Sequence, residues 1–123
     1  MDINRQMDQI GRMKMLTRDQ ILNAQDIKTE EVDVPEWGGA VTVKAMDGLE
    51  RDRFEMSIRD GTENVRSKMA VMTIVDESGK PMFTAGDLDA LGKKSGSALG
   101  RVFDVASRLA GFTKDEQEKL EKN

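Results

Sequence analysis

The residue types that most often perform catalysis are absent from this chain or stand alone in it. The sequence has no histidine and no cysteine, so it lacks the commonest general base, the commonest metal ligand and the thiolate nucleophile. Ser95 beside Lys93 and Lys94 is the one local pairing of a hydroxyl with an amine. A helix cap at Ser95 or Ser97 is the better interpretation, because an apolar-periodic segment follows directly. We therefore predict that the protein is not an enzyme.

Two loops share part of a ligand-binding motif. The segment 76–80, Asp-Glu-Ser-Gly-Lys, begins like a calcium loop but lacks the later oxygen ligands and the bidentate glutamate. The segment 92–95, Gly-Lys-Lys-Ser, has the wrong glycine spacing for a phosphate loop, and no strand is predicted before it. The adjacent carboxylates elsewhere are expected of a chain that is 34% charged. The sequence therefore predicts no metal and no cofactor.

The charge balance bears on partners. The formal net charge is -4 and no basic block occurs, whereas nucleic-acid binders usually display a basic patch. No stretch is apolar and long enough to span a bilayer. The segment 1–15 has basic residues without a following apolar run, so it is not a signal peptide. We expect neither nucleic acid nor a membrane as partner.

The first half of the chain predicts a short helix and then a β-hairpin. Residues 1–16 are polar with scattered methionines and are predicted to be a flexible arm or a frayed helix. Thr17 and Gln20 form a capping box that opens a helix over about 18–24. Segments 27–34 and 41–46 alternate apolar and polar residues, and the turn Pro35-Glu36-Trp37-Gly38-Gly39 separates them. The proline suggests that the first strand lies at a sheet edge.

The second half predicts helices. Asp47 is the expected cap of a helix over about 48–59, which ends before Gly61. Segment 63–75 fits a helix or a buried strand, and we favour the helix because Val65, Met69 and Met72 are spaced accordingly. A turn at 76–81 precedes a short helix that ends near Gly92. The strongest amphipathic pattern follows, with its apolar stripe running from Leu99 to Ala110, and a final polar helix runs to about residue 121.

Single side chains give weaker predictions about binding. Trp37, Val41 and Met46 are the candidate partner-binding residues. Trp37 is open to two interpretations: it packs back on the domain, or it faces a partner. Methionine is abundant, at nine residues, and its flexible thioether suits both cores and adaptable binding surfaces. These residues make protein binding the expected activity.

The predicted fold is α+β and mostly helical, with one antiparallel β-hairpin packed on the helices. In this setting the segments 32–43, 75–84 and 88–95, followed by the long helix through 101–109, resemble the phage tail assembly chaperones of long-tailed (siphophage-type) bacteriophages. The resemblance lies in the order and spacing of these segments. It covers about residues 17–123, which are taken as a single domain, with 1–16 outside it.

The resemblance implies a function. Such proteins bind the tape measure protein in the host bacterial cytoplasm, keep it soluble and help recruit tail tube protein, and they are absent from the mature virion. Many copies along one long client suggest a homo-oligomer. An extended apolar-striped helix is an aggregation hazard before assembly, which agrees with a covering role. Two other classes remain open: a structural head–tail connector or minor tail protein of the virion, and a small nucleic-acid-binding regulator.

Overall fold

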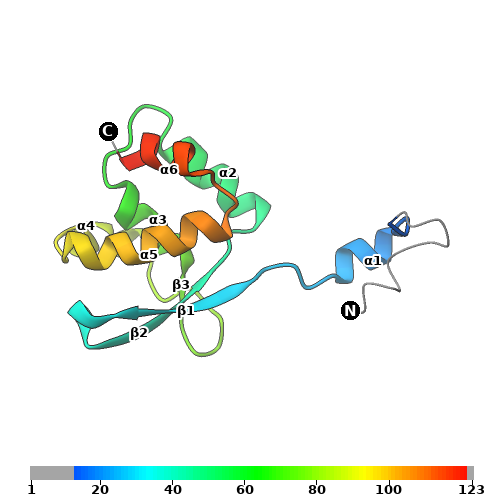
Figure 1. Cartoon of the computed structure of the whole chain (residues 1–123), viewed down its shortest axis with the longest axis horizontal. Helices are drawn as coiled ribbons and strands as arrows, with labels where there is room; N and C mark the ends of the chain where they lie inside the picture. The colour runs from blue at the N-terminus through cyan, green and yellow to red at the C-terminus, as the bar shows by residue number, and fades with distance from the viewer. Residues whose placement is uncertain (1–12, 122–123) are drawn as a thin grey trace.

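The computed structural model describes residues 13–121 and has the predicted α+β architecture, with helices dominating (Figure 1). The helices are α1 (Arg18–Asn23), α2 (Gly48–Ser57), α3 (Val65–Thr73), α4 (Leu88–Gly92), α5 (Gly96–Leu109) and α6 (Lys114–Glu121). The strands are β1 (Thr29–Val34), β2 (Gly39–Lys44) and β3 (Ile74–Val75), and two 3-10 turns are η2 (Pro35–Trp37) and η3 (Ala85–Asp87). In Figure 1, α5 lies between the hairpin and α6.

The predicted hairpin is present. β1 pairs antiparallel with β2, with Thr29 opposite Lys44 and Val34 opposite Gly39. The loop between them tightens into η2, which ends on Gly38 at φ 77°, a left-handed conformation that glycine adopts without steric cost. The strand order is β1-β2-β3, so β1 lies at the sheet edge, as the proline after it predicted.

The sheet has one strand more than the sequence predicted. Segment 63–75, for which a helix was favoured, is α3 only as far as Thr73, and then Ile74 and Val75 pair antiparallel with Val43 and Thr42. The apolar run therefore serves both structures, a helix first and a strand at its end. The free edge of β2 decides this, because it offers Ile74 and Val75 backbone partners that helical periodicity does not reveal.

The core lies between the sheet and the helices. Along β1, Val32 and Val34 are buried while Asp33 is exposed, which is the alternation expected of a half-buried strand. α5 packs on both β1 and β2 and on α3. The buried cluster joins the sheet, α2, α3, α4 and α5: Val32, Val34, Val43, Phe54, Val65, Met69, Ala70, Ile74, Leu91, Ala98, Leu99, Val102, Phe103 and Ala106.

Side-chain caps set the starts of four helices, and those of α1, α2 and α5 are the predicted ones. Thr17 with Gln20, and Asp47 with Glu50, form complete capping boxes at α1 and α2. The Ser95 hydroxyl accepts the Ala98 N–H at 3.2 Å at the start of α5. The start of α6 is a further box, in which the Glu116 N–H donates to the Thr113 hydroxyl and the Thr113 N–H donates to the Glu116 carboxylate, both at 3.1 Å. Caps satisfy backbone donors that the helix itself leaves free.

The segment 13–28 lies apart from this body until its last residue, Lys28, whose carbonyl accepts the Ala45 N–H at 2.8 Å. Every residue in it is exposed, and α1, which it contains, buries none of its side chains. Figure 1 shows α1 away from the other elements, joined to β1 by an extended stretch. The part of the predicted arm that falls on residues 1–12 lies outside the described residues. Within 13–121, no helix is both long and apolar enough to cross a membrane.

Candidate functional site

Trp37 lies at the tip of the hairpin and is half-buried against the core. Its neighbour Glu36 accepts hydrogen bonds from the Arg101 Nε of α5, at 3.0 and 3.2 Å to the two carboxylate oxygens. The hydrogen bond from Arg101 lowers the pKa of Glu36, so the carboxylate stays charged and the hairpin tip is held to α5. Trp37 therefore packs on the domain with part of its side chain. The rest of the side chain is exposed, and contact of that part with a partner stays a prediction.

Val41 and Met46 are also half-buried and pack against the core. Val41 pairs with Val32 inside the sheet, whereas Met46 lies beyond the last residue of β2. The structure therefore spreads Trp37, Val41 and Met46 along the hairpin and does not gather them in one patch. A role for the three residues in partner binding stays a prediction.

Large apolar side chains are most exposed elsewhere. In the segment 13–28, six of them are exposed: Met13, Met15, Leu16, Ile21, Leu22 and Ile27. α2 adds Leu49 and Met56, which are 61% and 67% exposed and lie seven residues apart on one helix face. Met82 is 48% exposed. Only a contiguous apolar patch is typical of a protein-binding region, and these side chains come from three separate segments of the chain.

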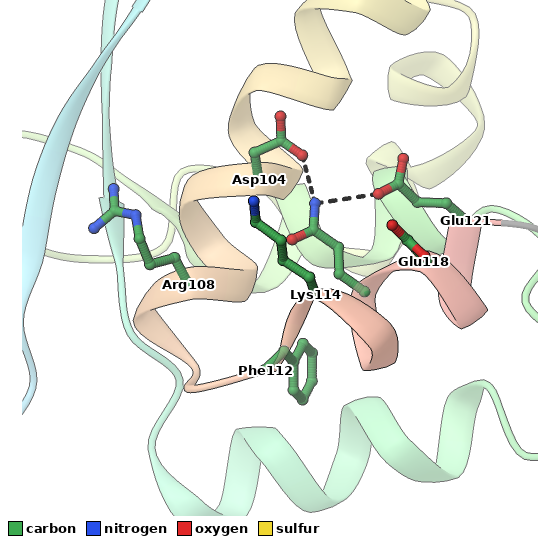
Figure 2. Close-up of a pocket in the computed structure, with 7 residues that line it drawn as sticks. Asp104, Arg108, Phe112, Lys114, Glu118 and Glu121 are labelled. Carbon is green, nitrogen blue, oxygen red and sulfur yellow. Dashed lines mark hydrogen bonds between the residues drawn. The ribbon is translucent and has the colours of Figure 1, made fainter.

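A hollow of about 550 Å³ lies between α5 and α6, and Figure 2 shows the side chains around it. The side chains that line it are mostly polar or charged: Asp104, Arg108, Phe112, Lys114, Gln117, Glu118 and Glu121. The Gln117 amide donates to Asp104 and, at 3.1 Å, to Glu121. Arg108 donates to Glu30 of β1 at 2.6 Å. Gln117 therefore connects α6 to α5 across the hollow, and Arg108 connects α5 to the hairpin.

Two further hollows flank α6. One of about 250 Å³ lies against α2 and is lined by residues that include Arg51, Ile58, Phe112 and Leu120. The other, of about 330 Å³, lies against the start of α3 and α5, and Leu120 lines it as well. α6 therefore touches the body through few apolar residues. The sequence already indicates this limited apolar contact, because Leu120 is the single large apolar residue of α6.

The electrostatics of residues 13–121 favour charged, paired groups. Hydrogen bonds from Ser78 and from the loop backbone lower the pKa of Asp76, and hydrogen bonds from Thr113 lower the pKa of Glu116, with the charge of Arg51 adding to the second shift. The ion pair with Glu30 raises the pKa of Arg108. A general acid at neutral pH needs a raised carboxyl pKa, and both of these carboxyl pKa values move the other way.

The motif-like loops have ordinary structural roles. The Asp76 carboxylate accepts the N–H groups of Ser78 and Lys80 at 2.8 and 3.0 Å, which closes the predicted turn on itself. Ser95 caps α5, as the sequence favoured. No group of three or more acidic residues within 13–121 is arranged to hold a metal ion. What the described surface offers is exposed apolar side chains and hollows lined mostly by charged and polar residues.

Comparison with known proteins adds a fold relationship. The sequence matches no known family profile and no curated protein. Among solved structures, the chain is similar to the tail assembly chaperone of bacteriophage HK97, with a TM-score of 0.59 and 18% sequence identity. The similarity covers 78% of this chain and 95% of that one. The two proteins therefore share a fold, which is the fold that the resemblance in the sequence implied.

Proposed function

We propose that this protein is a tail assembly chaperone of a long-tailed bacteriophage and that its client is the tape measure protein. The observation that supports the proposal most is the fold shared with the HK97 tail assembly chaperone, over nearly the whole of that chain. The order of motifs in the sequence pointed to the same group of proteins. The order of the sequence motifs and the fold thus support the same function.

The surface fits the proposal in physical terms. The client is a long helical protein whose apolar stripe is exposed until the tail forms, and such a stripe aggregates unless it is covered. Met15 and Met56 are 88% and 67% exposed, and flexible methionine side chains adapt to different apolar surfaces. Covering by such residues is reversible, which a chaperone that must later leave requires.

The proposal includes further partners. The chaperone helps recruit tail tube protein, which displaces it from the client, and several copies line one client as a homo-oligomer. This work takes place in the host bacterial cytoplasm and is complete before the virion is released. The chaperone is then left out of the finished particle.

Co-expression tests the central step. The tape measure protein encoded in the same genome is produced in bacteria with this chain or with a matched variant, Met56→Asp, which changes an exposed side chain. We expect the tape measure protein to stay soluble and to co-purify with the unchanged chain, and less of it to be recovered with the variant. Insolubility of the tape measure protein with and without the chain, while the chain itself is soluble, would overturn the proposal.

Mass spectrometry of purified virions tests the fate of the protein. A chaperone is expected to be missing from washed particles, although it is abundant in the infected cell. Recovery of the chain in particles, at a constant number of copies per tail, would identify it as a connector or minor tail protein instead.

A further inference from the structure

Apart from α1, which lies away from the body, α6 is the helix that the body holds least. It buries none of its side chains, although a complete capping box starts it. The three hollows described above lie along its flanks. Such a helix has its own N-terminal cap and a poorly packed interface with the body. It can therefore detach from the body while the rest of the fold stays intact.

Apolar packing and several polar contacts connect α6 and the residue before its cap to the body. Phe112 and Leu120 pack against the core, each only half-buried. Glu121 accepts from the Arg66 guanidinium at 3.0 Å, and the side chains of this ion pair remain 33% and 37% exposed. Gln117 donates to Asp104 across the hollow in Figure 2. Water competes for each polar contact, because none of these groups is enclosed.

Two cations next to α6, Arg51 and Arg66, each stand near an aromatic ring. The Phe54 ring of α2 lies 6.3 Å from the Phe112 ring, centroid to centroid. The Arg51 guanidinium stands 4.2 Å from the Phe112 ring centroid, and the Arg66 guanidinium stands 5.9 Å from that of Phe103. A helix that supplies apolar side chains and carboxylates together is complementary to these cations and rings.

The sequence of α6, with the residue before its cap, shows which pattern of side chains fits against α2, α3 and α5. Phe112 is followed by Glu116 four residues later, and Leu120 and Glu121 follow four and five residues after that. The spacing of four places Glu116 and Leu120 on one face of α6, and Phe112 lies in the turn just before the helix. Phe112 stacks with Arg51, Glu121 pairs with Arg66, and Leu120 lines two of the hollows.

We propose that α6 is a displaceable occupant of a groove formed by α2, α3 and α5, and that a client helix with the same pattern of one aromatic residue, one leucine and two carboxylates takes its place. The groove is thus self-covered in the free protein, which keeps its apolar surface from aggregating, and is opened by the client. The inference rests on the proposed function only for the identity of the client. The groove itself can be tested without that client.

The test uses the full-length chain and a synthetic peptide of residues 110–123 as the probe. The isotope-labelled chain is titrated with the peptide and followed by amide NMR shifts. One variant, Leu120→Asp, weakens the hold on α6, and Leu22→Asp makes the same exchange on exposed α1 as a matched control. A second pair, Asp104→Cys with Gln117→Cys, is joined by a short bis-maleimide, which reacts nowhere else because the natural chain has no cysteine.

We expect Leu120→Asp to bind the peptide at least about tenfold more tightly than Leu22→Asp, because the tethered α6 no longer competes at high effective concentration. Shifts should fall on α2, α3 and α5, and a peptide carrying Leu120→Asp should not bind. The cross-linked chain should bind at least about tenfold more weakly than the same chain before cross-linking. This comparison retains Leu120, so it stands even if Leu120→Asp fails to fold.

Three results would overturn the proposal. The first is equal peptide affinity for the cross-linked and open chains. The second is a set of shifts outside the three helices. The third is a doubled mass of the unchanged chain that Leu120→Asp abolishes, since a second copy would then fill the groove in place of a client. Failure of the tape measure protein to co-purify would count against the proposed function and leave the peptide result unaffected.

Discussion

α5 and α6 begin alike and are held differently. The Ser95 hydroxyl caps α5 and the Thr113 hydroxyl caps α6, at 3.2 and 3.1 Å from the backbone N–H each accepts. α5 then buries six side chains, whereas α6 buries none. The difference shows that a cap determines where a helix starts, while the apolar stripe behind the cap determines whether the fold depends on it. We infer that stability resides around α5 and that adaptability resides at α6.

The largest effect should come from the centre of α5. Phe103→Ala removes a fully buried ring and should lower the free energy of unfolding by about 3–5 kcal/mol, through lost burial and the cavity left behind. Urea denaturation measures the change. Leu22→Ala is the control, since Leu22 is 64% exposed, and should stay within about 0.5 kcal/mol. An equal loss of unfolding free energy in both variants would contradict the distinction between the core around α5 and the exposed segment 13–28.

A smaller effect is expected at α6. Leu120→Ala should cost about 1 kcal/mol or less, because the side chain is only half-buried and its apolar contact area is limited. The same variant should increase amide exchange within α6 while leaving α5 unchanged. Urea denaturation with hydrogen exchange measures both. A global loss above about 2 kcal/mol would place Leu120 among the core residues and contradict the comparison.

The ion pair between the hairpin tip and α5 should give a smaller, pH-dependent effect. Arg101 lowers the pKa of Glu36 in the folded state, so the pair stabilises the fold above the ordinary glutamate pKa and is lost as pH falls through the lowered value. Arg101→Gln should therefore be less sensitive to acid below about pH 5. Thermal unfolding across pH measures this difference. A parallel pH profile for both chains would show that Glu36 does not depend on Arg101.

The smallest effect is expected in the exposed segment 13–28. Ile21→Asp with Leu22→Asp should change the free energy of unfolding by no more than about 0.5 kcal/mol, because both side chains are more than half exposed. Thermal unfolding measures it. A clear loss of stability would mean that α1 packs on a surface, either of its own chain or of another copy.

Much of the fold follows from local chemistry that the sequence displays. The turn 35–39, the caps at Thr17 and Asp47, and the stripe of α5 each act over a few residues, so the predictions there are confirmed. The strand at Ile74 and Val75 was missed, because it depends on the free edge of β2 more than on its own residues. Local sequence patterns do not show where a segment lies relative to elements that are distant in the chain.

The candidate site shows the same limit more strongly. Leu120 and Phe112 are visible as apolar residues in a polar stretch, but only the packing of α2, α3 and α5 shows how loosely they are held. Trp37 drew attention as a lone tryptophan, and the Glu36–Arg101 pair beside it could not be foreseen, since the two residues are 65 apart in sequence. Surfaces built from several elements are therefore located by structure.

Hydrogen exchange of the full chain, alone and with its client helix, tests the account most directly. Alone, the amides of α6 should exchange at least about tenfold faster than those at the centre of α5, because α6 opens without global unfolding. With the client bound, protection should rise in α2 and α3 facing the groove and fall further in α6. Equal protection of α5 and α6 in the free chain, or client protection that leaves α6 and its groove unchanged, would contradict it.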